Sequence, residues 1–357
     1  MQLEKKIPVG ILAATGTVGQ RFVQLLANHP WFEIVAVTGS DRTVGRPYGE
    51  GVNWKLNGDP PRDIAELIVQ PTDTNLSIPG SPPVLFSALP TADAREWEPK
   101  FAAVGFAVVT NASSFRMAPD VPLLIPEVNP DHTGLIARQQ ANHNWPGFIV
   151  ASPNCSTTSA ILPLKVWQDA FGLEAAHIVT LQAISGAGYP GVSAMDIIGN
   201  VVPYIGGEDK KLENEPKKLL GHVSAGQLTL ADIKTSAQAN RVPVFDGHLA
   251  SVSVKLGQPV TVAEGIAALQ QWQAPAISRQ LPSTPEQVLI YRPEPDRPQP
   301  SLDRDSGSGL AWTVGKVNAC GVLDLKFISL THNTLRGAAS GSLLNAELLV
   351  VQGYIGK

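Results

Sequence analysis

The first part of the chain alternates short apolar runs with stretches of helical spacing. Thr17 to Ala27 carries Val18, Phe22, Leu25 and Leu26 on one helical face. Continuous apolar strands separated by helices predict a parallel sheet covered on both faces, which is typical of a doubly wound nucleotide-binding domain. The strand-length runs cover residues 7–13, 32–37, 84–88, 106–109 and 148–151.

After residue 155 the pattern changes to alternation. Residues 177–185, 252–256 and 323–330 are predicted strands. The last two alternate, with apolar side chains at 252, 254 and 256 and at 323, 325 and 327. Such alternation predicts an antiparallel sheet with one buried face. Residues 337–351 return to helical spacing, and this last helix can pack back onto the first domain. The proline-rich residues 292–300 predict a surface loop.

Composition narrows the class of protein. A length of 357 residues predicts about two domains. The net charge of −4, without a basic run, argues against nucleic acid and anionic membranes as partners. The chain has two cysteines, has no apolar run long enough to span a membrane, and begins with a segment, Met1 to Lys6, that does not resemble a signal peptide. We therefore expect a cytoplasmic protein.

A glycine-rich loop joins the first predicted strand to the first predicted helix. Ala13, Gly16 and Gly19 reproduce the spacing of a dinucleotide-binding loop, with alanine at a position where glycine is commoner. Small residues let the backbone approach a pyrophosphate at the helix N-terminus, where free N–H groups and the helix dipole favour anions. A plain strand-to-helix turn is the alternative.

Residues 38–43 end the second strand and predict which dinucleotide binds. An acidic residue here holds the ribose hydroxyl of NAD, whereas a hydroxyl with an arginine accommodates the 2′-phosphate of NADP. Ser40 and Arg42 favour NADP, and Asp41 leaves NAD open. A solvated polar turn is the alternative.

Cys155 lies in a hydroxyl-rich segment just before an apolar helical stretch. A position at a helix N-terminus is expected to lower the thiol pKa and yield a nucleophilic thiolate. Pro163 is expected to kink this helix or tighten its first turns. On this segment alone, a small buried structural cysteine is an equal alternative.

A nucleophilic thiolate needs an acid or base beside it. His248 follows a turn signal and precedes an alternating strand, so its side chain can project from a strand end. His29, His132, His143 and His222 lie among polar residues and are expected at the surface. No spacing of cysteines or histidines predicts a metal site.

Several segments together resemble the aspartate-β-semialdehyde dehydrogenase family, in its archaeal and fungal branch. They occur in the family's order along nearly the whole chain. They are residues 10–19, 111–116, 125–129, 152–158, 182–188, 206–211, 241–248 and 336–347. Ala13, Asp209-Lys210 and Ser340 depart from the family pattern without removing a reacting group.

The resemblance implies a reaction and a role for each matching residue. The enzyme reversibly reduces β-aspartyl phosphate to aspartate β-semialdehyde and phosphate with NADPH, through a thioester on Cys155, in the biosynthesis of lysine, threonine, methionine and isoleucine. His248 acts as acid and base, Asn154 holds the oxyanion and Gln182 orients the acyl group. Substrate contacts are implied for Arg241 at the α-carboxylate, Glu208 at the α-ammonium, and Asn111, Arg116 and Lys211 at the phosphate.

The resemblance also implies the cofactor, the domains and the assembly. NADP(H) is expected at Thr15, Gly16, Thr17, Val18, Ser40, Arg42, Thr43, Ser185, Gly186 and Asn345. Residues 1–153 with a C-terminal helix at 335–357 would form the Rossmann-like, doubly wound NADP-binding domain. Residues 154–334 would form an α+β catalytic and dimerisation domain with a largely antiparallel sheet, whose outer face builds a homodimer or homotetramer.

Other functions stay open at this point. A malonyl-CoA reductase would use the same cysteine, histidine and NADP loop, and Glu208 argues against it by offering a partner for an amino group. N-acetyl-glutamyl-phosphate reductase matches residues 206–211 and 336–347 poorly. A non-catalytic dinucleotide-binding sensor would have no need of an intact Cys155.

Overall fold

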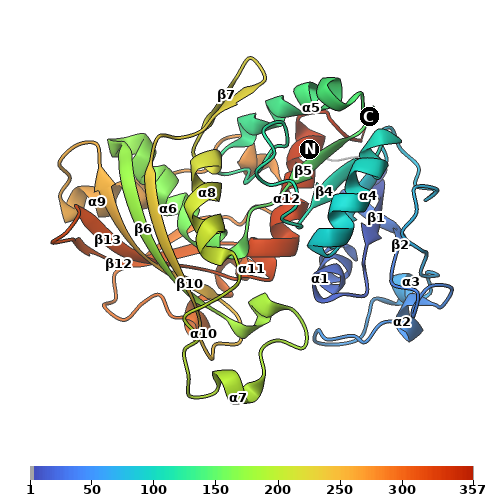
Figure 1. Cartoon of the computed structure of the whole chain (residues 1–357), viewed down its shortest axis with the longest axis horizontal. Coiled ribbons are helices and arrows are strands. Elements are labelled where there is room, and N and C mark those ends of the chain that lie inside the picture. Colours follow the sequence, from blue (N-terminus) through green and yellow to red (C-terminus); the bar gives the residue numbers. More distant parts are fainter. Residues whose placement is uncertain (1–3, 357) are drawn as a thin grey trace.

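The structure is a computed structural model that describes residues 4–356 (Figure 1). Residues 1–3 and 357 lie outside this range. Two predictions therefore fall partly outside the described residues. They concern the two ends of the first domain and the first half of the segment that we compared with a signal peptide. Within residues 4–356, no helix is both long and apolar enough to cross a membrane.

The first sheet has five strands within the described range, in the order β2-β1-β3-β4-β5, and every neighbouring pair is parallel. This confirms the predicted α/β doubly wound fold. The order reverses beside β1, and ligands bind outside the carboxyl ends of strands at such a point. The strands are β1 (Ile7–Leu12), β2 (Phe32–Val37), β3 (Val84–Ser87), β4 (Ala107–Thr110) and β5 (Phe148–Ala151).

Both faces of this sheet are covered. Along β3, Val84 and Phe86 belong to one apolar cluster, while Leu85 between them belongs to another. The first cluster includes residues of α1 (Thr17–Leu26) and α12 (Ser340–Val351), and the second includes residues of α4 (Thr91–Ala103). The last helix thus returns to the first sheet, as Figure 1 shows. The remaining helices here are α2 (Tyr48–Gly51), α3 (Arg62–Ala65), the 3-10 turn Pro130–Leu135 and α5 (Ile136–His143).

The second sheet has six strands in the described chain, in the order β11-β12-β13-β10-β6-β9. Its three inner pairs are antiparallel and its two outer pairs parallel, which confirms a largely antiparallel sheet. The strands are β6 (Leu173–Gln182), β9 (Lys234–Arg241), β10 (His248–Leu256), β11 (Leu289–Arg292), β12 (Trp312–Ala319) and β13 (Leu325–Thr331). A separate hairpin joins β7 (His222–Ser224) to β8 (Gln227–Thr229).

The buried face of the second sheet packs on α6 (Cys155–Phe171). Side chains of β10 alternate strictly between buried and more exposed. Trp167 of α6 meets Phe327 of β13 edge to face, with ring centroids 4.9 Å apart. The helix continues through Pro163. The other helices of this part are α7 (Ala194–Ile197), α8 (Glu208–Leu219), α9 (Val262–Gln271), α10 (Pro300–Asp303) and α11 (Ser306–Gly309), with 3-10 turns at Ile184–Ala187 and Ser278–Gln280.

The structure agrees with one of three local predictions and differs from the other two. The proline-rich segment is irregular between Arg292 and Pro300, as expected. The last α-helix begins at Ser340 rather than near residue 337, because a π-helical segment, Leu335–Ala339, precedes it. The surface placement of His29 and His132 is wrong, since both are buried. Each ring has hydrogen-bond partners inside the protein, which polar sequence neighbours could not reveal.

Candidate active site

Cys155 and His248 meet between the two sheets. The cysteine is the first residue of α6 and the histidine the first residue of β10, and Sγ lies 3.3 Å from Nε2. The amide N–H of Ala183 donates to Nδ1 of the same ring at 3.1 Å. A nitrogen that accepts carries no proton, so the neutral ring has its proton on Nε2 and points it at the sulfur.

Burial sets the charge state of this pair. Desolvation raises the pKa of Cys155 to about 12, and the Glu208 carboxylate adds to the rise, while Arg116, Lys211 and Arg241 oppose it. Desolvation also lowers the pKa of His248 to about 3, helped by Arg241. The predicted lowering of the thiol pKa is therefore wrong for this structure, because removal from water outweighs the helix terminus. Thiol and imidazole are both neutral at rest.

Asn154 caps the helix that carries the cysteine. Its Oδ1 accepts from the backbone N–H groups of Ser156 at 2.9 Å and Thr157 at 3.4 Å. Its Nδ2 donates to Oε1 of Glu208 at 3.0 Å. In this arrangement the amide that we expected to hold an oxyanion is already engaged with a carboxylate.

Glu208 joins the nucleophile segment to α8. Besides Asn154, its carboxylate accepts from Lys211 Nζ at 2.7 Å, Ser156 Oγ at 2.9 Å and Gln182 Nε2 at 3.3 Å. Burial opposes its ionisation, but the ion pair and these hydrogen bonds keep the pKa of Glu208 below its usual value. The predicted catalytic residue Gln182 and the predicted substrate groups Glu208 and Lys211 thus form one network.

Arg241 and Gly186 complete the surroundings of the histidine. Arg241 Nη1 donates to the carbonyl of Ala183 at 2.6 Å. A Cβ added to Gly186 would lie 2.8 Å from Arg241 Nη1 and 2.9 Å from His248 Nε2. Only a residue without a side chain therefore fits between these groups and the backbone. The neighbouring Ser185 Oγ accepts from Asn333 Nδ2 at 2.8 Å.

A cleft of about 170 Å³ joins the nucleophile to the start of α1. Gly337 forms part of its wall, and a Cβ there would lie 2.7 Å from Cys155 Cβ. This residue carries no predicted role, although a glycine within a small-residue run was a usable signal. The lining residues are Thr17, Val18, Asn111, Arg116, Asn154, Cys155, Ser185, Gly186, Gly188, Asn333, Thr334, Gly337 and Ala338.

The start of α1 fits a dinucleotide pyrophosphate. Gly16 occupies the N-cap position, and no side chain of the described residues caps the helix. Its first-turn N–H groups are therefore open to an anion. Ala13 has φ of 55°, in the region that favours glycine, and a Cβ on Gly19 would lie 2.3 Å from the Ala13 carbonyl oxygen. This close helix–strand contact is what the third glycine of such loops provides.

The other expected cofactor residues occupy different surroundings. Ser40 and Arg42 are exposed in the turn after β2, where Thr43 Oγ1 donates to the Ser40 carbonyl at 2.9 Å. Asn345 is buried, its Nδ2 donates to the Leu124 carbonyl and to Ser152 Oγ, and it is not among the cleft-lining residues within 4–356. Its place near the nicotinamide stays a prediction.

Two buried charged residues of α8 escaped the sequence analysis. Glu215 and Lys218 are 2% and 1% exposed, and both contact the segment that carries Arg116. Together with Glu208 and Lys211 they follow the spacing i, i+3, i+7, i+10 of one helix face. That periodicity was the available signal, but charged positions normally face water. Within residues 4–356, no group of three histidine, cysteine or acidic side chains could hold a metal ion.

Fold and site define a dinucleotide-binding protein with a cysteine–histidine pair at its cleft. Residues 8–136 match the family "Semialdehyde dehydrogenase, NAD binding domain", and residues 164–336 match "Semialdehyde dehydrogenase, dimerisation domain". The chain belongs to the aspartate-semialdehyde dehydrogenase family.

Individual relatives agree along nearly the full length. The aspartate-semialdehyde dehydrogenase of Archaeoglobus fulgidus is 49% identical over 97% of this chain and 99% of its own. That of Schizosaccharomyces pombe is 42% identical with the same coverage. The crystal structure of the Candida albicans enzyme with NADP superposes with a TM-score of 0.89 at 39% identity, covering 98% of this chain and 99% of that one. These matches confirm the archaeal and fungal resemblance.

Proposed function

We infer that this protein reversibly reduces β-aspartyl phosphate to aspartate β-semialdehyde and phosphate with NADPH. It is an oxidoreductase of amino-acid biosynthesis, on the route to lysine, threonine, methionine and isoleucine. One observation carries the inference: the Cys155–His248 pair, 3.3 Å apart, shares a cleft with the uncapped start of α1 in a chain 49% identical to a named aspartate-semialdehyde dehydrogenase.

The proposed chemistry begins at the sulfur. Cys155 attacks the acyl carbon, a C–S bond forms, and the C–O bond to phosphate breaks, while the thiol proton leaves with the phosphate. Bound NADPH supplies the hydride that reduces the thioester carbon. The aldehyde then departs and releases the thiolate. His248 Nε2–H points at this sulfur and stabilises the thiolate until a proton returns. Because Nδ1 accepts from the Ala183 N–H, we assign neutral His248 as a hydrogen-bond donor to the sulfur at this stage, and its role as a base would need the other tautomer.

The proposed substrate contacts draw on unused donors. Arg116 Nε and Asn111 Nδ2 are buried without a hydrogen-bond partner among the described atoms, and both residues line the cleft. We assign the phosphate to them and to Lys211. Arg241 is assigned to the α-carboxylate and Glu208 to the α-ammonium. Binding at Glu208 would loosen its ion pair with Lys211, which frees that ammonium for phosphate.

Further proposed roles concern the acyl group and the cofactor. Asn154 and the backbone N–H of Cys155 would hold the oxyanion, and Gln182 would orient the acyl group. Thr15, Gly16, Thr17 and Val18 would bind the pyrophosphate of NADP(H) through the open N–H groups of α1. Ser40, Arg42 and Thr43 would take the 2′-phosphate. Ser185, Gly186 and Asn345 would lie toward the nicotinamide.

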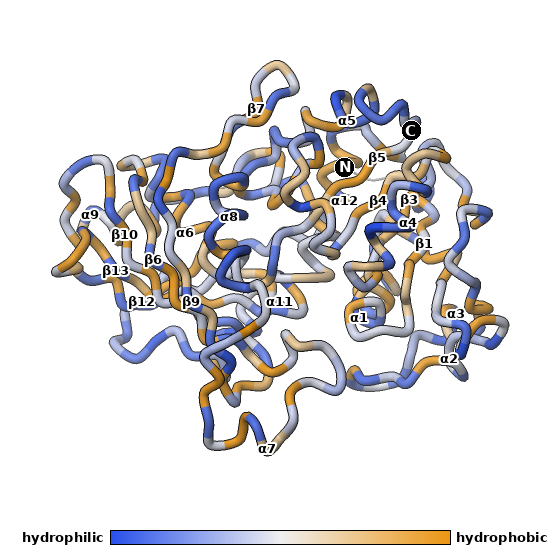
Figure 2. Tube along the Cα trace, viewed as in Figure 1, coloured by the Kyte–Doolittle hydropathy of each residue, from blue (hydrophilic) through white to orange (hydrophobic). Residues whose placement is uncertain are grey.

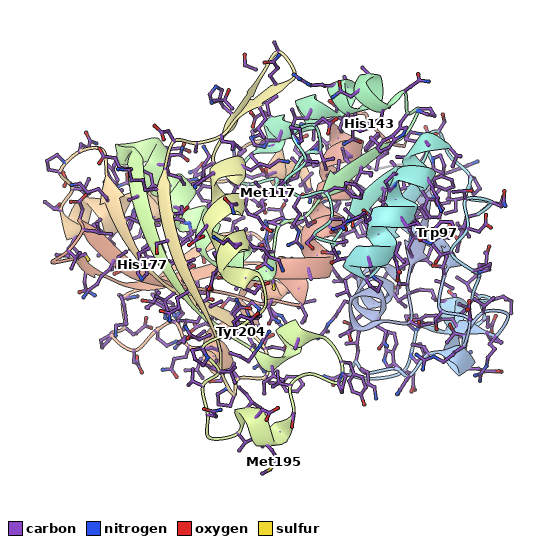
Figure 3. The ribbon with its side chains drawn as sticks, in the orientation of Figure 1. Trp97, Met117, His143, His177, Met195 and Tyr204 are labelled. Atoms are coloured by element: carbon purple, nitrogen blue, oxygen red, sulfur yellow. The ribbon has the colours of Figure 1, made fainter. Side chains whose placement is uncertain are left out.

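The assembly proposed is a homodimer or homotetramer. The family description of residues 164–336 as a dimerisation domain supports a homo-oligomer. His177 of β6, labelled in Figure 3, is exposed between buried neighbours along the strand. Leu181 follows at the same face of the strand and is 37% exposed. We propose this face as the interface. We also propose the division into residues 1–153 with 335–357, and residues 154–334, and a place in the cytoplasm.

Substrate assays test the function. Purified protein with NADPH is mixed with β-aspartyl phosphate or with malonyl-CoA, and NADPH absorbance is followed. Oxidation with the acyl phosphate is expected, and oxidation with malonyl-CoA alone would overturn the assignment. Mass spectrometry of protein quenched during turnover should find an acyl group on Cys155. A sensor would show neither turnover nor acylation.

A further inference from the structure

Glu215 bridges two parts of the cleft that are far apart in the sequence. Its Oε1 accepts from Arg116 Nη1 at 3.1 Å, and its Oε2 accepts from the backbone N–H of Asn154 at 2.7 Å. Arg116 belongs to the loop after β4, and Asn154 immediately precedes Cys155. One carboxylate on α8 therefore touches both the proposed phosphate site and the nucleophile segment.

The bond to Asn154 acts on the backbone. Asn154 is the N-cap residue with extended φ and ψ of −60° and 144°, so its N–H is outside the helical hydrogen-bond pattern. Glu215 accepts a hydrogen bond from this buried donor and so holds the backbone immediately before Cys155. A small rotation of that peptide would move Sγ relative to His248 Nε2.

The bond to Arg116 acts on a side chain. Nη2 of Arg116 donates to the backbone carbonyl oxygen of Asn111 at 2.7 Å, and Nη1 of the same guanidinium donates to Glu215. The two nitrogens at the far end of the guanidinium are thus fixed. Nε stays buried and unpaired within the described structure, and so does Nδ2 of Asn111, another residue that lines the cleft. The carboxylate and carbonyl together orient the group and leave donors for an anion.

Packing alone does not require a carboxylate here. A buried charge costs free energy unless it is paired and hydrogen-bonded, and an apolar side chain of similar volume often serves as well. Figure 2 shows α8 as a hydrophilic helix although part of it lies in the interior. Its Lys218 Nζ donates to the carbonyls of Arg116, Ala118 and Val121 at 2.6 to 2.7 Å. Met117 of the same loop lies beside α8 in Figure 3.

We propose that Glu215 is a positioning residue that sets the phosphate-binding Arg116 at the correct distance from the Cys155 nucleophile. The proposal rests on the proposed function, since it names a residue for that reaction. Its consequence is a coupling between phosphate binding and attack. Displacement of Arg116 shifts the carboxylate, and the carboxylate shifts the peptide before the sulfur.

The test is Glu215→Gln, assayed with aspartate semialdehyde, phosphate and NADP⁺. Glutamine has the same shape, but a single acceptor oxygen cannot serve both donors, so one buried N–H loses its partner. We expect the KM for phosphate to rise about 10-fold and kcat to fall about 10-fold, the range set by one unsatisfied buried donor. The KM for aspartate semialdehyde, held by Arg241, should stay within about twofold.

Two companion variants sharpen the result. Glu213→Gln removes a charge from the same helix, where Glu213 makes a 3.8 Å ion pair with Lys210, and should leave all constants unchanged. Glu215→Asp keeps both acceptor oxygens and should recover part of the phosphate affinity. Thermal unfolding of each variant shows whether it is folded. If Glu215→Gln does not fold, Glu215→Asp replaces it in the test: its KM for phosphate should rise, while its KM for aspartate semialdehyde should not.

The outcomes are distinct. Equal rises of both KM values, or constants within twofold of the original protein, would overturn the positioning role. A selective loss for phosphate that Glu215→Asp partly restores supports it. The unmodified protein is assayed in the same series, and its failure to turn over these substrates would instead count against the proposed function.

Discussion

Two helices begin at the same cleft, and the protein treats their first turns differently. At the start of α6, Asn154 Oδ1 accepts from two backbone N–H groups, and Glu215 takes the N–H of Asn154 itself. At the start of α1, the cap residue is Gly16, and the described side chains offer the first turn no acceptor. One helix terminus is satisfied by the protein, and the other is open.

The difference assigns a task to each helix. A satisfied terminus has few donors left for an outside anion, but it holds its first residue rigidly, which suits a nucleophile. An open terminus presents free N–H groups and the positive end of the helix dipole, which suits a pyrophosphate. Chemistry at α6 and cofactor binding at α1 should therefore be separable by mutation.

The largest expected effect comes from Cys155→Ala. Turnover should fall by about 10⁴-fold or more, because the covalent step is lost. NADPH affinity, measured by fluorescence titration, should change less than about twofold, since α1 is untouched. Ordinary turnover by this variant would show that the cysteine at the start of α6 takes no part in the reaction.

Asn154→Ala should weaken both the helix and the reaction. Loss of the cap should cost about 1 kcal/mol in the free energy of unfolding, and loss of an oxyanion donor should lower kcat about 100-fold. Asn154→Ser is the matched control, because serine still caps but lacks the amide donor. For Asn154→Ser, urea unfolding should give a free energy of unfolding near the original value, while initial rates should give a kcat that is still low. A serine variant of full activity would exclude the amide from catalysis.

Gly16→Asp would give α1 the cap that it lacks. A Cβ at this position meets only the Ala13 carbonyl oxygen at 3.5 Å, an ordinary contact, and φ and ψ of −76° and 167° suit a capping residue. The protein without cofactor should gain a few tenths of a kcal/mol, while the KM for NADPH rises about 10-fold through repulsion of the pyrophosphate. Gly16→Asn, capped but uncharged, should lie between. An unchanged KM would place the cofactor elsewhere.

The smallest expected effect concerns stability against pH. The pKa of His248 is about 3 in the fold and near its ordinary 6.5 when unfolded, so the unfolded chain takes up the proton first as pH falls. The contribution of the neutral His248 ring to stability is therefore fully present above pH 6.5 and is lost progressively as the pH falls toward 3. When the pH falls from 7.5 to 5.5, the free energy of unfolding measured in urea should fall by about 1 kcal/mol less for His248→Asn than for the original protein. Equal losses would mean that the imidazole takes up a proton as readily in the fold as in the unfolded chain.

Much of the fold was predictable because its signals are local. The runs at residues 32–37 and 148–151 match β2 and β5 residue for residue. Alternation along β10 predicted its buried face because successive side chains of a strand point to opposite sides. The π-helical Leu335–Ala339 was not predictable, since its small residues fit a regular helix equally well.

The candidate site was predictable only in part. Cys155 and His248 stood out by residue type and by place at an element boundary, and the structure brings them together across 93 positions of sequence. Their pKa directions did not follow from the segment, because desolvation depends on everything packed around the pair. Glu215 looked like an ordinary solvated charge, and only its two distant partners mark it.

The sequence by itself determined the order of helices and strands, the glycine loop and the reactive side chains, because periodicity and turn chemistry act between near neighbours. The tertiary structure decided which donors are satisfied, which stay open, and how strongly burial suppresses charge. Those properties are sums over groups that meet only after the chain has folded.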